Sequence, residues 1–577
     1  HWMVHSFPTR RSSDLFASLA WALGAEYPKS AVERAWKYIF QNHPHDTICG
    51  AGGDQMEKDL HYRFDQSKLI SFGLMRRGMQ EIQKHIDNSD LDTKEAVLTV
   101  FNPSPYSRTE VISALVDLPD GSGYEGFSIR DTDGTEVARQ DVSRFPCGTL
   151  VRNLQDISLE QRAERVHLHF EAKNVPALGY KTFHIKHEQR DTPQFGSMVP
   201  ERNCMENEHL FVRFNCDGTL CLVHKETGHV FHGLHYIEDS GEMGHPWIHI
   251  SPQHDEVITS HGVPVDIMLE DDGPISARYR VDYRMRIPVD IEQREDGVHR
   301  TKERTDLVVT SQFTLTKGAK FVHVKTTLNN PCRQHRIRVV FPTYLAAKVS
   351  SAEAAFDVID RRIDRPKGSL YYGKPNPTYP MHRFVSLTDG KIGLSVFNNG
   401  IREYEVTDNE ARELAITLLR GFEFKQSPVI DRWDIYPDDV MSQCLGDHNW
   451  SYGIYPHAGD WGKAQIYPEA DRFTLPLEAA QAGPKGGDLP KELSFIEINP
   501  ASIAMSTLKH AEDREGAILR LYNPTDKTVK ATLTVARPVK EAWITNLNED
   551  RREQLKPSGN KIRSEERRVG KECTIQC

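Results

Sequence analysis

The sequence predicts a mainly β protein in which a helical segment precedes a series of antiparallel β-sandwiches. Between Phe16 and about Asp87 the apolar residues recur at helical spacing. From Ala96 onward, short runs of alternating apolar and polar residues are separated by Gly, Pro, Asn and Asp. A strand, an Asn-Pro turn and a second strand occur twice, around Asn102-Pro103 and Asn523-Pro524. These observations indicate a remnant of a helical bundle followed by at least two similar sandwiches.

The helical segment contains two predicted helices. The first begins near Ser30, and its apolar positions Ala31, Ala35, Trp36 and Ile39 follow three-to-four spacing. After an interruption at 42–53, a longer helix is predicted from about Asp54 to His85. Its stripe of Met56, Leu60 and Phe64 suits packing against neighbouring helices. Since two helices bury little surface alone, we interpret residues 16–90 as part of a larger bundle.

The β region divides into three predicted sandwiches. A small sandwich is expected over 95–195, a large one over 200–475 and a terminal one over 493–562. Alternation is strongest at 278–287, 307–315 and 321–328, which is typical of antiparallel sheets. The Gly- and Pro-rich run Gly483-Pro484-Lys485-Gly486-Gly487 marks a predicted linker over 476–492.

Size and composition exclude several classes of protein. A chain of 577 residues is too long for one core and predicts roughly three to four domains. The net charge of -10 argues against a nucleic-acid partner. No apolar run approaches the roughly 18 residues of a membrane helix, so no membrane association is expected. The nine cysteines form no CxxC pair. This pattern favours free thiols in a reducing compartment, and we predict cytoplasmic localisation.

The two ends of the sequence differ from the rest. Residues 1–15 have neither the apolar core nor the cleavage site of a signal peptide. Residues 563–577 are dense in charge and lack periodicity. We interpret both as non-native sequence that flanks the natural segment, with natural disordered tails as the alternative. Neither interpretation assigns them any chemistry.

The interruption between the helices carries the residues that are most suggestive of chemistry. It contains His43, Pro44, His45 and Asp46. Pro44 cannot continue a helix and restricts its neighbours, so the backbone holds His45 in place. Imidazole is a good zinc ligand, but a zinc site needs three or four ligands, and adjacent residues cannot supply them all. On the residues alone, the simpler interpretation is that both histidines cap helix ends.

The run Asn42-His43-Pro44-His45-Asp46-Thr47-Ile48-Cys49-Gly50, with Tyr62-Arg63-Phe64-Asp65-Gln66 downstream, resembles the middle-domain signature of bacterial glycoside hydrolase family 38. Similar blocks follow in order along the chain. They include Phe101-Asn102-Pro103, Asp217-Gly218-Thr219-Leu220, Glu403-Tyr404-Glu405-Val406, Ile416-Thr417-Leu418-Leu419-Arg420, Ile454-Tyr455-Pro456-His457 and Leu521-Tyr522-Asn523-Pro524. The resemblance covers almost the whole chain between its two ends and includes mannosylglycerate hydrolase-like members. It implies a three-helix-bundle middle domain followed by β-sandwich domains of the mannosidase C-terminal type.

The resemblance also implies a zinc site of two His and two Asp that binds the vicinal hydroxyls of a terminal mannose. His45 matches the second His ligand, and Asp46 matches a carboxylate that contacts sugar hydroxyls. The remaining ligands, the nucleophilic Asp and the general acid belong to a catalytic domain that should precede Phe16. We therefore expect no catalytic residue in this chain, one partly ligated zinc ion, and no activity from the fragment alone.

The leading hypothesis is a zinc-dependent, retaining exo-α-mannosidase with a mannoside as substrate. A near alternative is a hydrolase of mannosylglycerate or 6-phosphomannosylglycerate, and phosphate recognition would call for Arg or Lys residues outside this chain. An alternative of another class is a non-catalytic carbohydrate-binding β-sandwich protein. The sequence leaves homo-oligomerisation open.

Further candidates have weaker signals. Trp247 stands where the family usually carries a Tyr, so it could stack on a sugar or simply pack as an aromatic residue. Arg361 and Arg362 match a place where an Arg reaches toward the substrate, or form a solvated charge cluster. Histidines 224, 229, 232, 235, 245, 249, 254 and 261 suggest a second metal site. Their spacing follows no ligand template, so we interpret them as surface or strand residues.

Overall fold

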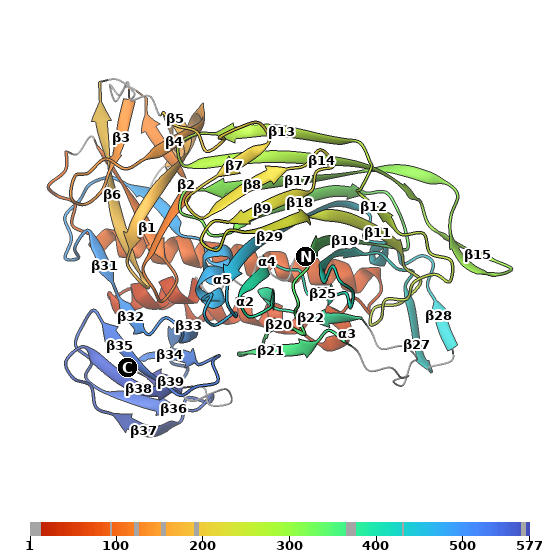
Figure 1. Cartoon of the computed structure of the whole chain (residues 1–577). Helices are drawn as coiled ribbons and strands as arrows, with labels where there is room; N and C mark the ends of the chain where they lie inside the picture. Colours follow the sequence, from red (N-terminus) through yellow and green to blue (C-terminus); the bar gives the residue numbers. More distant parts are fainter. Residues whose placement is uncertain are drawn as a thin grey trace.

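The computed structural model describes residues 13–92, 95–120, 126–151, 157–189, 195–364, 377–429, 432–566 and 573–576. It confirms a mainly β fold in which helices lie at the N-terminal end of the chain (Figure 1). In the described part, every ladder between named strands is antiparallel, as the sequence predicts. No helix of the described residues is long and apolar enough to cross a bilayer.

The helical region consists of residues 13–22, α2 (Lys29–Asn42), the single turn α3 (His45–Ile48) and α4 (Asp54–His85). The predicted break and the bounds of the long helix are confirmed. Leu60 and Phe64 are buried, but Met56 is exposed, so the prediction that it joins the packing stripe is wrong. Met56 lies in the first turn of α4. Leu60 and Phe64 lie further along the helix and form a small apolar cluster with Ile39.

The helix formed by residues 13–22 packs closely against α4. Leu15 and Phe16 are fully buried. A Cβ atom at Gly78 would lie 2.7 Å from the carbonyl carbon of Phe16, so only glycine allows this approach. Residues 13–15, which fall in the predicted leader, are thus part of the folded helical region. The non-native origin of that segment stays a prediction.

The small sandwich is built from β1 to β6. A five-stranded sheet has the order β3-β6-β1-β30 with β31 paired to β6, and it faces the three-stranded sheet β2-β5-β4. The strands are β1 (Ala96–Asn102), β2 (Arg108–Pro119), β3 (Gly126–Arg130), β4 (Arg139–Val151), β5 (Leu159–Val175), β6 (Gly179–Glu188), β30 (Glu478–Ala482) and β31 (Glu492–Ser494). β30 lies inside the segment that we predict as a linker, and it pairs with β1 over Val97 to Phe101.

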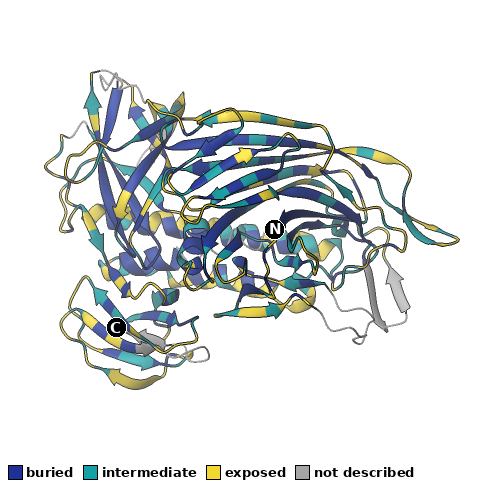
Figure 2. Cartoon of the chain, viewed as in Figure 1, coloured by how far each residue is buried: buried dark blue, intermediate teal, exposed yellow. Residues whose placement is uncertain are grey.

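The large sandwich holds the main core. Three sheets pack around its buried apolar side chains. They have four strands (β10-β9-β8-β7), six strands (β12-β11-β19-β26-β25-β22) and nine strands (β13-β14-β17-β18-β29-β24-β23-β20-β21). Figure 2 shows this buried interior and the exposed hairpin β15–β16 that projects from it. The helix α5 (Ile466–Thr474) packs on a separate aromatic cluster that includes Phe384 and Phe397.

The elements of the large sandwich have the following bounds: β7 Cys204–Glu206, β8 Leu210–Phe214, β9 Leu220–His224, β10 His229–Leu234, β11 Tyr236–Gly241, β12 Ile258–Thr259, β13 Val265–Asp272, β14 Ser276–Pro288, β15 Ile291–Arg294, β16 Gly297–Arg300, β17 Arg304–Thr316, β18 Val322–Asn330, β19 His335–Pro342, β20 Val349–Ala354, β21 Asp357–Arg362, β22 Thr378–Pro380, β23 Phe384–Thr388, β24 Ile392–Asn398, β25 Glu403–Val406, β26 Glu413–Arg420, β27 Lys425–Val429, β28 Arg432–Ile435, η1 Met441–Gln443 and β29 Gly446–Ala458.

The terminal sandwich pairs β32-β35-β38 and β33-β34-β39-β36-β37. Its strands are β32 Ile496–Asn499, β33 Ala504–His510, β34 Ala517–Tyr522, β35 Val529–Val535, β36 Ala542–Thr545, β37 Arg551–Leu555, β38 Lys561–Glu566 and β39 Cys573–Gln576. β39 belongs to the predicted tail and pairs with β34 and β36. One apolar cluster joins this sandwich to residues 15–19 and to α4.

Seven of the nine cysteines, at positions 49, 147, 204, 216, 221, 332 and 444, are free thiols. This agrees with the pattern from which we predicted a reducing compartment. The cytoplasmic localisation itself stays a prediction.

Candidate functional site

His45 and Asp46 form the first two positions of the single helical turn α3. Pro44 is extended, with φ of -50° and ψ of 136°, and its carbonyl accepts hydrogen bonds from the amides of Thr47 and Ile48. The helix therefore starts abruptly after the proline. This local geometry turns both side chains outward, and the His45 side chain is 92% exposed. Its Nε2 atom lies 3.3 Å from Oδ2 of Asp46.

The donor set fits one part of a zinc site. An imidazole and a carboxylate are both suitable zinc ligands, and both are open to solvent here. Within the described residues, the one group of three His, Cys, Asp or Glu side chains that lie close enough to hold a metal does not include His45 or Asp46. Two adjacent residues cannot enclose a zinc ion, so the site needs ligands from elsewhere, as the sequence predicts.

The chain leaves α3 through a tight turn that brings the motif against the large sandwich. Gly50 has φ of +80°, a conformation that favours glycine, and a Cβ atom there would lie 4.0 Å from the Phe422 ring. Ala51 donates its amide to the carbonyl of Asp46 at 3.1 Å. The motif is therefore anchored directly behind its two exposed side chains.

A reciprocal cap fixes the start of α4 to the large sandwich. The Asp54 amide donates to Oδ1 of Asp439 at 2.7 Å, and the Met441 amide donates to Oδ1 of Asp54 at 2.8 Å. Asp439 thus acts as the N-terminal acceptor of a helix that is remote in sequence, and its charge suits the positive end of the helix dipole. This contact sets the position of α3 relative to the sheets.

The segment after β11 is organised by the buried carboxylate of Glu242. Its Oε1 accepts the amides of Gly244 at 2.6 Å and Ile250 at 3.2 Å, while Oε2 accepts from Nδ1 of His249 at 2.5 Å. Arg420, the last residue of β26, completes the set with Nε 3.0 Å from Oε2. Burial alone would raise the pKa of Glu242, but His249, Arg420 and the Ile250 amide together bring it below its usual value.

Trp247 stands at the tip of this segment and reaches the motif. Arg420 also donates a hydrogen bond to the carbonyl of His245, which holds the tip in place. Burial raises the pKa of the Cys49 thiol, and a hydrogen bond from the Trp247 side chain opposes that rise. Trp247 therefore lies beside the end of α3 and is 43% exposed. The structure brings this predicted candidate to the motif.

Arg361 and Arg362 have other contacts. The guanidinium of Arg361 lies 5.3 Å from the centre of the Tyr379 ring and donates to the Tyr404 hydroxyl at 3.4 Å. Arg362 forms an exposed ion pair with Asp364. Among the described residues, neither arginine forms a hydrogen bond or ion pair with α3. Their role at the substrate stays a prediction.

Sequence reasoning missed Glu242, Arg420 and Asp439. Arg420 falls in a sequence block that resembles the family, but nothing local indicates that it meets Glu242 across 178 residues. Asp439 follows Tyr436-Pro437-Asp438, a turn signal that carries no hint of a distant helix. Each of these residues acts through a contact between separate strands or domains. The periodicity of the sequence does not predict such contacts.

Comparisons with known proteins bear on the domains that surround this site. The sequence model of the Glycosyl hydrolases family 38 C-terminal domain matches residues 205–428. The model of that family's C-terminal beta sandwich domain matches residues 502–572. Together they cover just over half of the chain and fall on the large and the terminal sandwich.

A putative mannosylglycerate hydrolase of Halalkalibacterium halodurans is 24% identical over 525 residues, which are 85% of this chain and 57% of that protein. Alpha-mannosidase 2C1 of Mus musculus is 24% identical over 248 residues, 42% of this chain and 22% of that protein. The chain thus spans little more than half the length of the first relative.

Among solved structures, an alpha-mannosidase from Enterococcus faecalis has a TM-score of 0.87 at 23% identity, covering 97% of this chain and 66% of that one. A second protein from Enterococcus faecalis, described as belonging to glycosyl hydrolase family 38, has a TM-score of 0.83 at 22% identity, covering 98% of this chain and 71% of that one. At these identities the likeness establishes the fold.

Proposed function

This chain belongs to glycoside hydrolase family 38, and from that premise we propose that it forms part of a zinc-dependent, retaining exo-α-mannosidase. The substrate would be a terminal α-mannosyl residue. The observation that carries the proposal is the pair His45 and Asp46, adjacent and exposed on a turn that the large sandwich holds in place. We further propose that the chain alone is inactive, because the described residues nominate no pair of carboxylates for a retaining mechanism.

The residues of this chain would act by binding and orientation. When bound, zinc supplies a Lewis acid that can orient and polarise a sugar diol. His45 would offer a ring nitrogen as one ligand, since its side chain has no buried partner to displace. Asp46 would accept hydrogen bonds from sugar hydroxyls beside it. Trp247 would offer an aromatic face next to the same turn.

A second candidate reaction is the hydrolysis of mannosylglycerate or its 6-phosphate. The relative from Halalkalibacterium halodurans, a putative mannosylglycerate hydrolase that matches 85% of this chain, favours the hydrolysis of mannosylglycerate. Both candidates break an α-mannosyl bond, so they differ in the leaving group and not in the proposed roles of His45 and Asp46.

The test is an activity assay on two proteins: this chain alone, and a longer protein in which a family 38 catalytic domain precedes it. With an aryl α-mannoside, we expect hydrolysis only by the longer protein, and we expect a chelator to abolish it and zinc to restore it. Mannosylglycerate, its 6-phosphate and α-1,3- and α-1,6-mannobiose then separate the two candidate reactions. Mannoside binding without turnover in either protein would support a non-catalytic carbohydrate-binding role instead.

A further inference from the structure

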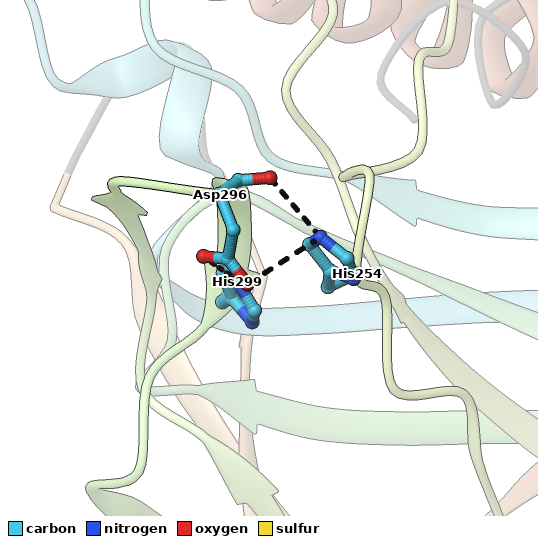
Figure 3. Close-up of side chains that lie close together, drawn as sticks. All are labelled: His254, Asp296 and His299. Atoms are coloured by element: carbon cyan, nitrogen blue, oxygen red, sulfur yellow. Dashed lines mark hydrogen bonds and ion pairs between the residues drawn. The ribbon is translucent and has the colours of Figure 1, made fainter.

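Three side chains from two parts of the sequence meet at the projecting hairpin of the large sandwich. β15 and β16 are joined by the two-residue turn Glu295-Asp296, because Arg294 pairs with Gly297. Asp296 lies in this turn, and His299 lies on β16. His254 comes from the segment between β11 and β12. Figure 3 shows the three side chains grouped together.

The geometry places two imidazoles against one carboxylate. His299 Nε2 lies 2.8 Å from Oδ1 of Asp296, and His254 Nε2 lies 3.7 Å from Oδ2. His254 Nε2 is also 3.1 Å from the Asp296 backbone carbonyl. The two rings stack with centroids 4.3 Å apart and an interplanar angle of 16°. The ligand atoms of all three residues lie within 4.8 Å of one another.

The backbone around the cluster is fixed by contacts that do not depend on a ligand. The His254 amide donates to the Val298 carbonyl at 3.1 Å, and the Val298 amide donates to the side chain of Gln253 at 2.9 Å. Next to the cluster, Arg300 forms a buried ion pair with Asp239 at 2.6 Å. The donor atoms are therefore presented by a preformed frame, which lowers the entropy cost of binding.

We propose that His254, Asp296 and His299 form a binding site for a divalent transition-metal ion such as Zn²⁺. A ring nitrogen from each histidine and one carboxylate oxygen would supply three ligands, and water would fill the remaining positions. Two imidazoles select for zinc, nickel or copper over magnesium and calcium, which prefer oxygen ligands.

The site is independent of the proposed glycosidase function. Its three residues are separate from His45 and Asp46, and it is complete within this chain. Bound metal would tie the segment that follows Glu242 and Trp247 to the hairpin. It would also have a practical consequence, because zinc taken up by this chain alone would report on the hairpin cluster and not on His45.

The experiment is a calorimetric titration of the reduced protein with Zn²⁺, with Mg²⁺ as the comparison ion. The variants are His254→Ala, His299→Ala, the double variant of both, and Asp296→Asn. His232→Ala, an exposed histidine of β10, serves as the matched control. The measured quantities are the number of Zn²⁺ equivalents bound and their affinity. We compare each variant with the wild type, because zinc binding elsewhere in the chain then cancels.

We expect the wild type to bind one more equivalent of Zn²⁺ than the double variant, and to bind no Mg²⁺ there. Each single variant should weaken this equivalent by about 100-fold, at the upper end of the loss typical of an outer-shell partner. His232→Ala should leave it unchanged. Equal zinc uptake by the wild type and the double variant overturns the proposal, and so does loss of the equivalent in His232→Ala. The exposed Asp296→Asn change and circular dichroism of every variant separate lost binding from lost folding.

Discussion

Arg420 forms an ion pair with the buried carboxylate of Glu242, with Nε 3.0 Å from Oε2. The pair joins the end of β26 to the segment that carries Trp247, and the Trp247 side chain opposes the rise that burial causes in the pKa of Cys49, behind the His45–Asp46 motif. The position of the motif thus depends on charges that lie well away from it in sequence.

Replacing Glu242 with Gln should destabilise the large sandwich. Removing one partner of a buried ion pair leaves the other charge uncompensated, at a cost of about 3–5 kcal/mol. Urea unfolding followed by circular dichroism measures the change in midpoint. Glu256→Gln is the matched control, because Glu256 forms an exposed ion pair with Arg304 in the same region. Its cost should not exceed about 1 kcal/mol. Equal midpoints for the two variants would contradict the role of Glu242.

Glu478 on β30 should make stability depend on pH. Burial raises the pKa of Glu478 to about 7, from 4.5 in the unfolded chain. The folded state therefore keeps a proton that the unfolded state releases, so stability is fully present below pH 4.5 and falls as the pH rises to about 7. The loss is about 3 kcal/mol, from 1.36 kcal/mol per unit of pKa.

The variant Glu478→Gln removes this titration. It should be more stable than the wild type at pH 8 and should lose that advantage at pH 4.5, as measured by thermal unfolding at both values. Glu497→Gln, on the exposed side of β32, is the control and should show no such pH dependence. A stability difference for Glu478→Gln that is the same at both pH values would rule out the titration.

Replacing Asp439 with Ala should loosen the start of α4. The change removes the acceptor for the Asp54 amide, and the loss of a helix cap costs about 1 kcal/mol. Hydrogen exchange at Asp54 and the following turn should accelerate by about fivefold, as the same energy implies. Asp438→Ala, one residue away and exposed, should leave these exchange rates unchanged. Unchanged exchange in Asp439→Ala would mean that the cap does not hold the motif.

His45→Ala and Asp46→Asn should leave the fold intact. Both side chains are exposed, so the free energy of unfolding should change by no more than about 0.5 kcal/mol. In the longer protein of the activity assay, each should lower kcat/KM by at least about 100-fold if the residue contacts zinc or sugar. His232→Ala, an exposed histidine of β10, is the control. Full activity in His45→Ala would remove this site assignment.

Trp247→Ala should raise KM for a mannoside by up to about tenfold, because an aromatic face contributes about 0.5–1.5 kcal/mol beyond burial. Trp247→Tyr should keep KM close to that of the wild type. Ile250→Ala changes an exposed apolar residue of the same segment and serves as the control. An unchanged KM in Trp247→Ala would favour the alternative that this residue only packs as an aromatic side chain.

Local patterns in the sequence determine the helices and the class of the fold. The bounds of α4 follow from a break at Gly53 and a long apolar period, and the strands follow from alternation. Local patterns fail where the burial or the conformation of a residue depends on its neighbours in the folded structure. Met56 has the period of a buried residue, but its side chain lies over Gly52 in the preceding turn and stays exposed. β30 consists of Glu, Ala and Gln, which favour helices, yet it is a strand because β1 offers it a free edge.

The sequence by itself determined the family resemblance, the position of the motif and the chemical identity of His45 and Asp46. Only the tertiary structure decided what surrounds them: the Asp439 cap, the Glu242–Arg420 ion pair, the approach of Trp247 and the group of His254, Asp296 and His299. The physical reason is the range of the forces. Helical and strand periods arise between residues a few positions apart, whereas these contacts depend on sheet register and domain packing between residues up to several hundred positions apart.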